Sequence, residues 1–163
     1  LKPKSEWIDL QDAVEAALAA VRRRQDRISW TRSFAPDLPP VAADPVLLET
    51  VLVNVLDNAA KHGGRAVTIT AQLRDGRVGL AVEDDGPGIP AALLPHVFDR
   101  FTRAVDAGAA PGAGLGLSIC KGLIEAMGGT VAAAIPVTGD RGTRVAITLP
   151  AGAAPADAGE DAP

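Results

Sequence analysis

Apolar residues recur along this chain with two different periods, and the period changes at residues that favour turns. Over residues 9–24 apolar side chains return every three or four positions behind Asp9, which predicts an amphipathic helix with an aspartate N-cap. Residues 27–35 alternate between apolar and polar, as a strand does. A second, longer helix is predicted from Asp44 to Lys61, because aspartate followed by proline favours helix initiation.

The second half of the chain predicts two hairpins with helical segments between them. The first hairpin turns at Arg74-Asp75-Gly76, and Gly128-Gly129 ends the last helix. Antiparallel pairs separated by helices predict a two-layer α/β sandwich, with about five strands in a mixed, mostly antiparallel sheet under about three helices. The expected elements are strands 66–73 and 77–82, a short helical segment 91–97, a helix 115–127, and strands 131–135 and 143–149.

Composition divides the 163 residues into one domain with two flanking segments. Residues 1–8 are expected to be a linker, and residues 9–150 a single domain. Residues 151–163 contain only small residues, proline and three acids, which predicts a disordered tail because little apolar surface can be buried. A net charge of −4 argues against a nucleic-acid partner, and a single cysteine, Cys120, excludes an internal disulfide. No apolar run reaches the length of about 20 residues that spans a membrane.

The first segment with candidate chemistry lies in the long helix. Asn54, Asn58, Lys61 and His62 follow one another at i, i+4, i+7 and i+8, so they share one helical face. An amide oxygen is a hard, neutral ligand that suits Mg²⁺, and a lysine at a helix end can contact phosphate. A solvated helix face is the simpler interpretation of the same pattern.

The second segment follows the strand 77–82. Gly86 and Gly88 permit positive φ and close approach of a ligand, and Ile89 can pack beneath a ring. Asp84 can accept a hydrogen bond from an exocyclic amine, which would select adenine over guanine. An ordinary acidic turn is the alternative. The run from Gly86 also fits a dinucleotide-binding pattern, which we reject because two acids precede it and no βαβ unit surrounds it.

Two further segments lie closer to the C-terminus. Phe98 and Phe101 are spaced one turn apart ahead of Arg103, and they predict either core packing or the anchor of a mobile segment. Gly112, Gly114 and Gly116 run into a helix, where exposed backbone N–H groups favour phosphate oxygens. A flexible hinge is the alternative for these glycines, and no Gly-Lys-Ser/Thr follows as in a P-loop.

In this order the four segments resemble the N, G1, F and G2 boxes of the catalytic, ATP-binding domain of sensor histidine kinases. These domains belong to a wider superfamily that includes the gyrase-like ATPases. The resemblance covers residues 9–150 and implies the Bergerat (GHKL) fold, with ATP and Mg²⁺ bound. The gyrase-like enzymes carry a water-activating glutamate where this chain has Asn54, and an amide cannot act as that base. The resemblance therefore implies phosphoryl transfer and not hydrolysis.

The resemblance also assigns roles to residues. It implies that Asn58 and Asn54 hold Mg²⁺, that Lys61 and His62 contact phosphate, and that Asp84 reads adenine. Asn54, Lys61 and Arg103 are the expected catalytic residues. The implied nucleotide-binding residues are Asn54, Asn58, Lys61, His62, Asp84, Gly86, Gly88, Ile89, Phe101, Gly112, Gly114, Leu115, Gly116 and Leu117.

Neither His62 nor His96 stands in the acid-flanked helical pattern of a phosphoacceptor histidine. The resemblance thus implies an acceptor on a separate dimerisation domain, a response regulator downstream, and a homodimeric, inner-membrane receptor with this domain in the cytoplasm. The domain alone is expected to be monomeric and without membrane contact. Segments starting at Ser5, Leu38 and Lys121 are most similar to the potassium-responsive KdpD-type kinases. A serine kinase of the anti-sigma-factor type and a docking module that has lost nucleotide binding are the alternatives.

Overall fold

The computed structural model describes residues 2–62, 64–90, 92–99, 113–135 and 141–152. One five-stranded sheet has the order β2-β4-β5-β7-β6, and only β2 and β4 are parallel neighbours. The elements are β1 (Glu6–Ile8), α1 (Leu10–Arg22), β2 (Ser29–Phe34), β3 (Val41–Ala43), α2 (Pro45–His62), β4 (Ala66–Arg74), β5 (Arg77–Asp84), η1 (Leu94–His96), α4 (Ala113–Ala126), β6 (Thr130–Ala134) and β7 (Thr143–Pro150).

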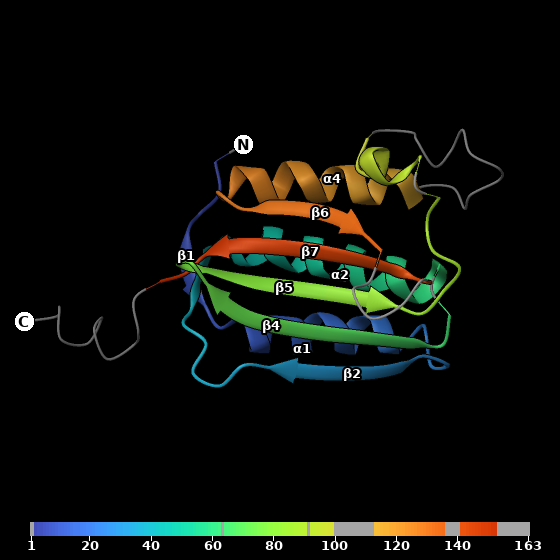
Figure 1. The fold of residues 1–163 in the computed structure, drawn as a ribbon. Helices are drawn as coiled ribbons and strands as arrows, with labels where there is room; N and C mark the ends of the chain where they lie inside the picture. The colour runs from blue at the N-terminus through green and yellow to red at the C-terminus, as the bar shows by residue number, and fades with distance from the viewer. Residues whose placement is uncertain (1, 63, 91, 100–112, 136–140, 153–163) are drawn as a thin grey trace, which may run out of the picture.

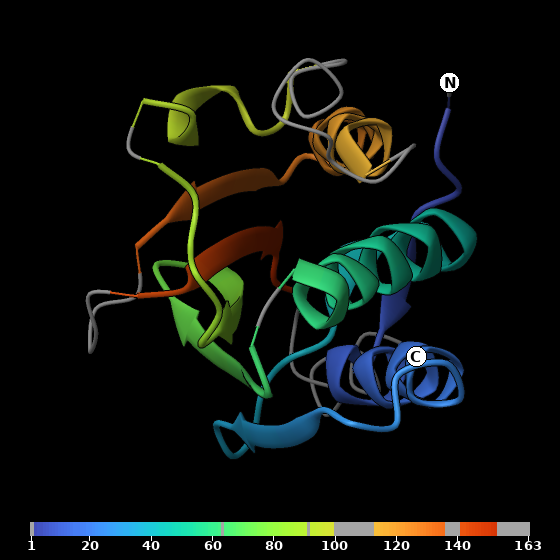
Figure 2. The same cartoon turned by 90° about the vertical axis from the view of Figure 1, so that its right-hand side faces the viewer.

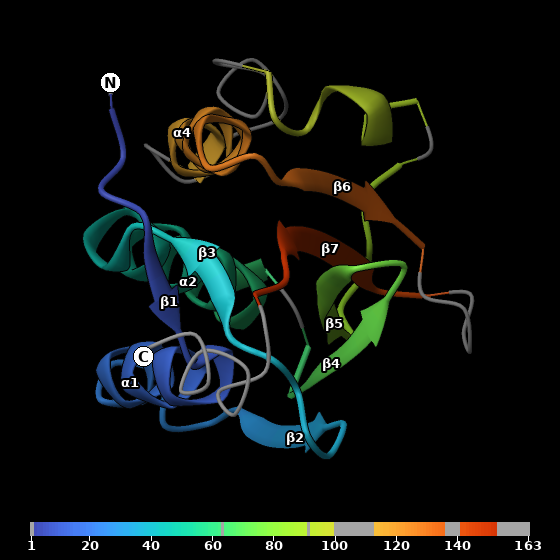
Figure 3. The same cartoon turned by 90° about the vertical axis from the view of Figure 1, so that its left-hand side faces the viewer.

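The helices α1, α2 and α4 form a layer on one face of the sheet, as Figure 1 and the end-on view of Figure 3 show. This arrangement confirms the predicted two-layer α/β sandwich. The central helix α2 packs against α1 on one side and α4 on the other, and it also contacts β5. The apolar face of α2 is fully buried and supplies the middle of the core: Leu48, Val51, Leu52, Val55, Leu56 and Ala59.

Both predicted helix starts are confirmed by their caps. The side chain of Asp9 accepts a hydrogen bond from the Asp12 N–H at 3.0 Å, one of the N–H groups that a helix leaves unpaired. The Asp44 carboxylate caps α2 in the same way, accepting from Val46 N–H at 2.9 Å and from Leu47 N–H at 3.2 Å.

The first hairpin turns where it was predicted to, but over two residues instead of three, because Arg74 belongs to β4. Asp75 and Gly76 have φ of 53° and 74°, the left-handed pair that matches the twist of the flanking strands. Gly128 ends α4 with φ of 81°, and the Gly129 N–H bonds back to the Ile124 carbonyl at 2.9 Å.

The edges of the domain differ from the prediction. Residues Glu6–Ile8, expected in the linker, form β1 and pair with β3 in a separate two-stranded sheet. Three-residue strands are too short to reveal a period of two in the sequence. At the other end, Gly152 N–H bonds to the Pro40 carbonyl at 2.6 Å, while the remainder of the predicted tail lies outside the described residues.

Two helical predictions also shift. The segment expected over residues 91–97 contains the short 3₁₀ helix η1, and Ala91 lies outside the described residues. The helix expected from Leu115 begins at Ala113. Within the described part of the chain, no helix has the length and hydropathy needed to cross a membrane.

Two glycines near the end of α4 provide a matched test of the packing. A Cβ at Gly122 would meet no atom within 4 Å, whereas a Cβ at Gly129 would overlap the backbone carbonyl of Thr148. We expect Gly122→Ala to raise the free energy of unfolding by about 0.5–1 kcal/mol, because alanine is the better helix former. Gly129→Ala should lower it. Equal effects of the two substitutions in urea unfolding would contradict the close approach of Gly129 to β7.

Candidate functional site

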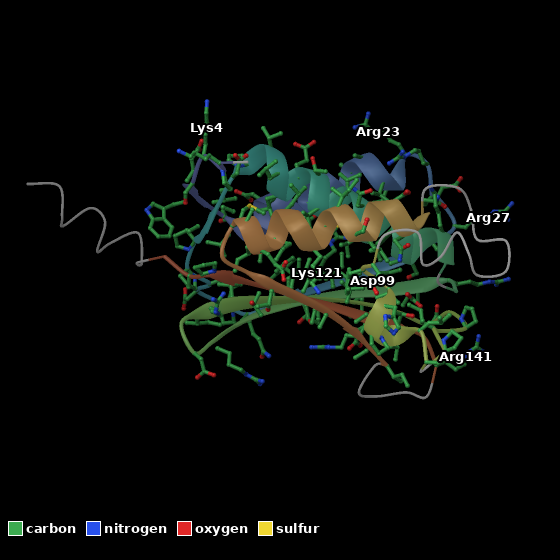
Figure 4. All side chains as sticks on the ribbon, turned by 90° about the horizontal axis from the view of Figure 1, so that it is seen from above. Lys4, Arg23, Arg27, Asp99, Lys121 and Arg141 are labelled. Carbon is green, nitrogen blue, oxygen red and sulfur yellow. The ribbon has the colours of Figure 1, made fainter. Side chains whose placement is uncertain are left out.

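Four segments that are distant in sequence end or begin at one end of the sheet. They are the C-terminal end of α2, the C-terminal end of β5, the first turn of α4 and the start of β7, all at the right of Figure 1. Figure 2 views this end directly, with α2 and α4 pointing toward the reader. Three of the four predicted chemical segments therefore meet here in part. Figure 4 places the labelled Arg27 and Arg141 at the same end, so cationic side chains stand near it.

The polar face of α2 carries both asparagines. Asn54 and Asn58 are half-buried, one turn apart. Asn54 donates from Nδ2 to the Thr50 carbonyl at 2.7 Å, which leaves its Oδ1 as the acceptor. The side-chain amide of Asn58 has no hydrogen-bond partner within the described part of the chain. Two amide oxygens are therefore available for a hard cation, and this donor set fits Mg²⁺.

Lys61 ends the same face, within one turn of Asp57. Its ammonium Nζ lies 3.0 Å from Asp57 Oδ2, and the Lys61 side chain is half exposed. The other carboxylate oxygen of Asp57, Oδ1, is buried without a partner in the part of the chain that the structure describes. An anion that approaches Lys61 must compete with Asp57 for the ammonium. His62 is the last residue of α2, and its side chain lies outside what the structure describes.

The pleat of β5 determines which side of the sheet Asp84 faces. Alternate residues Val78, Leu80 and Val82 are buried in the core, and Asp84 continues this row at the strand end. The carboxylate accepts from the Gly86 N–H at 2.9 Å. Burial raises the pKa of Asp84, although hydrogen bonds from the backbone of Gly86 and Thr143 act in the opposite direction. A half-buried acceptor of this kind suits an amino group on a flat ring.

The neighbouring carboxylate, Asp85, makes a different set of contacts. Its Oδ1 accepts from the backbone N–H groups of Arg65 and Ala66, at 2.8 and 3.0 Å, and the Asp85 N–H donates to the Ala66 carbonyl at 3.3 Å. These hydrogen bonds, the Ala66 one first, lower the pKa of Asp85. Ala66 is the first residue of β4 and Arg65 precedes it, so Asp85 extends the contact between β4 and β5 beyond the pair Val67–Asp84, a few residues after the end of α2.

Two glycines bring the start of β7 against this turn. Gly88 and Gly142 have φ of 83° and 90°, and a Cβ at Gly88 would lie 2.9 Å from the Gly142 carbonyl oxygen. A Cβ at Gly142 would overlap the Asp84 carbonyl. Of the two glycines that permit positive φ, Gly88 adopts it, whereas Gly86, which is buried, is not among the positive-φ residues.

The remaining predicted site residues fall into two groups. Ile89 is half-buried beside the turn, Leu117 is buried on α4, and Phe98 is half-buried against the core. Gly114, Leu115 and Gly116 lie in the first turns of α4, with only their backbone described. Phe101, Arg103 and Gly112 lie outside the described residues, as does nearly all of the segment expected to be mobile.

Asp85, Gly142 and Thr143 were missed by sequence reasoning. Thr143 pairs with Asp84 across β5 and β7, is buried, and bonds through its backbone to the Asp84 carboxylate. The doubled acid of Asp84-Asp85 was visible in the sequence, but nothing there assigned different partners to the two carboxylates. Gly142 stands in an ordinary turn-like sequence, and only the pairing of β7 with β5 reveals its contact.

Two other reactive residue types are accounted for structurally. Cys120 is buried on α4, donates to the Val51 carbonyl at 3.8 Å, and has a pKa raised to about 12 by burial, so it is a packing residue and not a nucleophile. His96 is exposed on η1, with Nδ1 2.9 Å from Asp99 Oδ2.

A separate depression of about 610 Å³ lies between α1 and residues 35–40. Its lining shares no residue with the site described here, and α1 begins at the opposite end of the molecule. We therefore assign the chemistry to the convergence of α2, β5, α4 and β7. Among the described residues, no group of three or more His, Cys, Asp or Glu side chains is placed to hold a metal ion.

Comparison with known proteins identifies the family of this chain. Residues 43–153 match the family described as "Histidine kinase-, DNA gyrase B-, and HSP90-like ATPase". The chain is 44% identical over 120 residues to "Sensor histidine kinase component HK1" of Mycobacterium tuberculosis, covering 74% of this chain and 70% of that protein. It is 34% identical over 154 residues to "Sensor protein KdpD" of Escherichia coli, covering 93% of this chain but only 17% of that protein.

Solved structures give the same result. The chain superposes on the mycobacterial sensor histidine kinase MprB with a TM-score of 0.76 at 32% identity, covering 90% of this chain and 97% of that one. Full-length ShkA in complex with AMPPNP gives a TM-score of 0.77 at 28% identity, covering 94% of this chain and 33% of that one.

The raised pKa of Asp84 predicts a pH-dependent stability. A carboxyl whose pKa is higher in the folded state destabilises the fold once ionised, and this penalty disappears below its unfolded pKa. We therefore expect Asp84→Asn to raise the urea midpoint at about pH 7 and to have a smaller effect at about pH 3. The exposed Asp26→Asn is the control. A lower midpoint for Asp84→Asn at neutral pH would show that the ionised carboxylate stabilises the fold.

Proposed function

Because this chain belongs to the family of histidine kinase-, DNA gyrase B- and HSP90-like ATPases, we propose that it is the catalytic domain of a sensor histidine kinase, which binds ATP with Mg²⁺ and transfers the γ-phosphoryl group to a histidine on a separate domain. The observation that carries the proposal is that the ends of α2 and β5 lie at the same end of the sheet, with Asp84 at the end of β5 and both asparagines on α2. Asp85, the next residue, bonds to Arg65 and Ala66, which lie three and four residues after the end of α2.

In this function Asp84 accepts a hydrogen bond from the exocyclic amine of adenine. Guanine would present a carbonyl at the same position, and two acceptors would then face each other. Ile89, Gly86 and Gly88 shape the pocket around the ring. The desolvation that raises the pKa of Asp84 also strengthens its hydrogen bond to the base, because little water competes there.

The phosphates extend from the base toward α2 and α4. Asn58 and Asn54 offer the amide oxygens that would hold Mg²⁺, which supplies charge neutralisation between the phosphates. Lys61 contributes a positive charge once it leaves Asp57. We propose the next residue, His62, as a further phosphate contact. The first turn of α4 directs backbone N–H groups toward phosphate oxygens, with Gly112, Gly114, Leu115, Gly116 and Leu117 as the proposed contacts.

Transfer requires an attacking group from outside the described site. A histidine nitrogen of the partner domain forms the new bond to the γ-phosphorus as the bond to the ADP oxygen breaks. Asn54 carries an amide that cannot deprotonate water, which favours transfer over hydrolysis. We propose Phe101 as a nucleotide contact and Arg103 as the further cation that stabilises the transferring phosphoryl group.

The chain spans 17% of KdpD and 31% of another mycobacterial relative, so the properties of the whole receptor are proposals. We propose a homodimeric receptor whose dimerisation domain precedes this domain, with residues 1–5 as the connection, the catalytic domain in the cytoplasm, and a response regulator as the final acceptor. The domain alone would be a monomer. KdpD-type membership is a finer proposal, supported by 34% identity to KdpD, but MprB proteins match at 35–38%.

The metal site is tested by Asn58→Ala. A saturating ligand raises stability by about 2.7 kcal/mol at one hundred times its dissociation constant. We expect Mg·ATP to raise the Tm of the unmodified chain and to lose most of this effect in Asn58→Ala, while the Tm without nucleotide changes little. Gln72→Ala, which removes an exposed amide from the uncovered face of β4, is the control. An undiminished Mg·ATP shift would remove Asn58 from the site.

The reaction is tested by supplying this chain with ATP labelled at the γ-phosphate and a histidine-containing dimerisation domain from a related kinase. We expect labelled product that is lost in acid and stable in base, because a phosphoramidate hydrolyses in acid. Acid-stable label on a serine-containing substrate would instead support a serine kinase of the anti-sigma-factor type. A chain whose Tm does not respond to Mg·ATP would be a docking module. No relative reported above is described as either of these.

A further inference from the structure

We propose that Asp85 is a positioning residue, which fixes the C-terminal end of α2 against the turn that reads the base so that one nucleotide can engage both. The proposal rests on the proposed function and extends it to a residue outside the predicted site. Asp85 itself need not touch the nucleotide. Its effect is on the relative placement of Asp84 and the phosphate-facing end of α2.

The contacts of Asp85 lie just beyond the end of the β4–β5 pairing, whose last pair is Val67 with Asp84, and they reach the residues that connect β4 with α2. Two N–H groups from the residues that follow α2 converge on a single oxygen, Asp85 Oδ1, at 2.8 and 3.0 Å. The Asp85 N–H returns a bond to the Ala66 carbonyl at 3.3 Å. Three hydrogen bonds therefore connect residue 85 with residues 65 and 66, a sequence separation of 19 or 20. Bonds to an ionised acceptor are stronger than neutral ones.

Gly64 lies directly against the carboxylate of Asp85, which is otherwise exposed to solvent. A Cβ at Gly64 would overlap Asp85 Oδ1 and approach the Asp85 carbonyl to 3.0 Å. A side chain at position 64 would therefore displace the carboxylate from its present position. This gives a second, independent way to disturb the same contact without changing Asp85.

The position of Asp85 determines what its loss should do. Asp84 is held separately, by β5, by the Gly86 N–H and by the start of β7, so the base pocket can persist without Asp85. The end of α2 would lose its fixed distance from that pocket. Displacement of about 1 Å between binding groups is enough to lower activity by about a hundredfold in enzymes. The phosphates, which depend on α2, should then contribute less than they do in the unmodified chain.

The experiment compares adenosine, which fills only the base pocket, with Mg·ATP, which engages both parts. Titration calorimetry of the whole chain gives both dissociation constants, and the quantity compared is the dissociation constant of adenosine divided by that of Mg·ATP. We expect this ratio to fall by about tenfold in Asp85→Ala and in Gly64→Ala, with adenosine affinity within about twofold of the unmodified chain. Asp85→Asn should restore most of the ratio, because an amide oxygen can still accept both hydrogen bonds. Glu125→Ala, an exposed acid near the far end of α4, is the matched control for lost charge.

The outcomes separate this role from a merely structural one. Loss of folded protein would weaken both ligands equally and leave the ratio unchanged, and an unchanged ratio would overturn the proposal. Hydrogen exchange gives a second readout without ligand: the Arg65 and Ala66 amides should exchange faster in Asp85→Ala and remain protected in Asp85→Asn. If the unmodified chain binds neither ligand, the proposed function fails together with this role. If Asp85→Ala does not fold, Gly64→Ala and Asp85→Asn still decide the question.

Discussion

The pleat of β5 is the constraint on which the site depends. Successive residues of a strand face opposite sides, so the buried row of Val78, Leu80 and Val82 obliges Asp84 to face the helical layer at the point where the strand ends. Shifting the register by one residue would reverse this and would expose the apolar row to water. Core packing therefore fixes the direction of a functional carboxylate, and the pairing of β5 with both β4 and β7 holds that register on two sides.

Much of the fold could be predicted because its signals are local. The caps at Asp9 and Asp44, the two-residue turn at Asp75-Gly76 and the alternation in β4, β5 and β7 each follow from chemistry within a few residues. The strands β1 and β3 could not be predicted, because three residues carry no measurable period and their pairing spans more than thirty positions.

The same distinction between local signals and tertiary contacts applies to the site. The amide stripe of α2 and the aspartate after β5 were visible as motifs, because each is contiguous or helically spaced. The partners of Asp85 and the close approach of Gly142 to Asp84 arise only from tertiary contacts. Gly86 shows the limit of motif reasoning in the other direction: the motif contains two glycines, but only Gly88 uses positive φ. A glycine in a sequence shows that a positive φ is allowed at that position, but it does not show whether the residue adopts one.

The burial of Cys120 has a practical consequence for spectroscopy. It is the only cysteine in the chain, is enclosed by the helical layer, and holds its proton up to about pH 12. A maleimide or a nitroxide reagent at neutral pH therefore has no native thiolate to attack. One cysteine introduced on the surface would accept a fluorophore or spin label at a defined point, with the native core left intact.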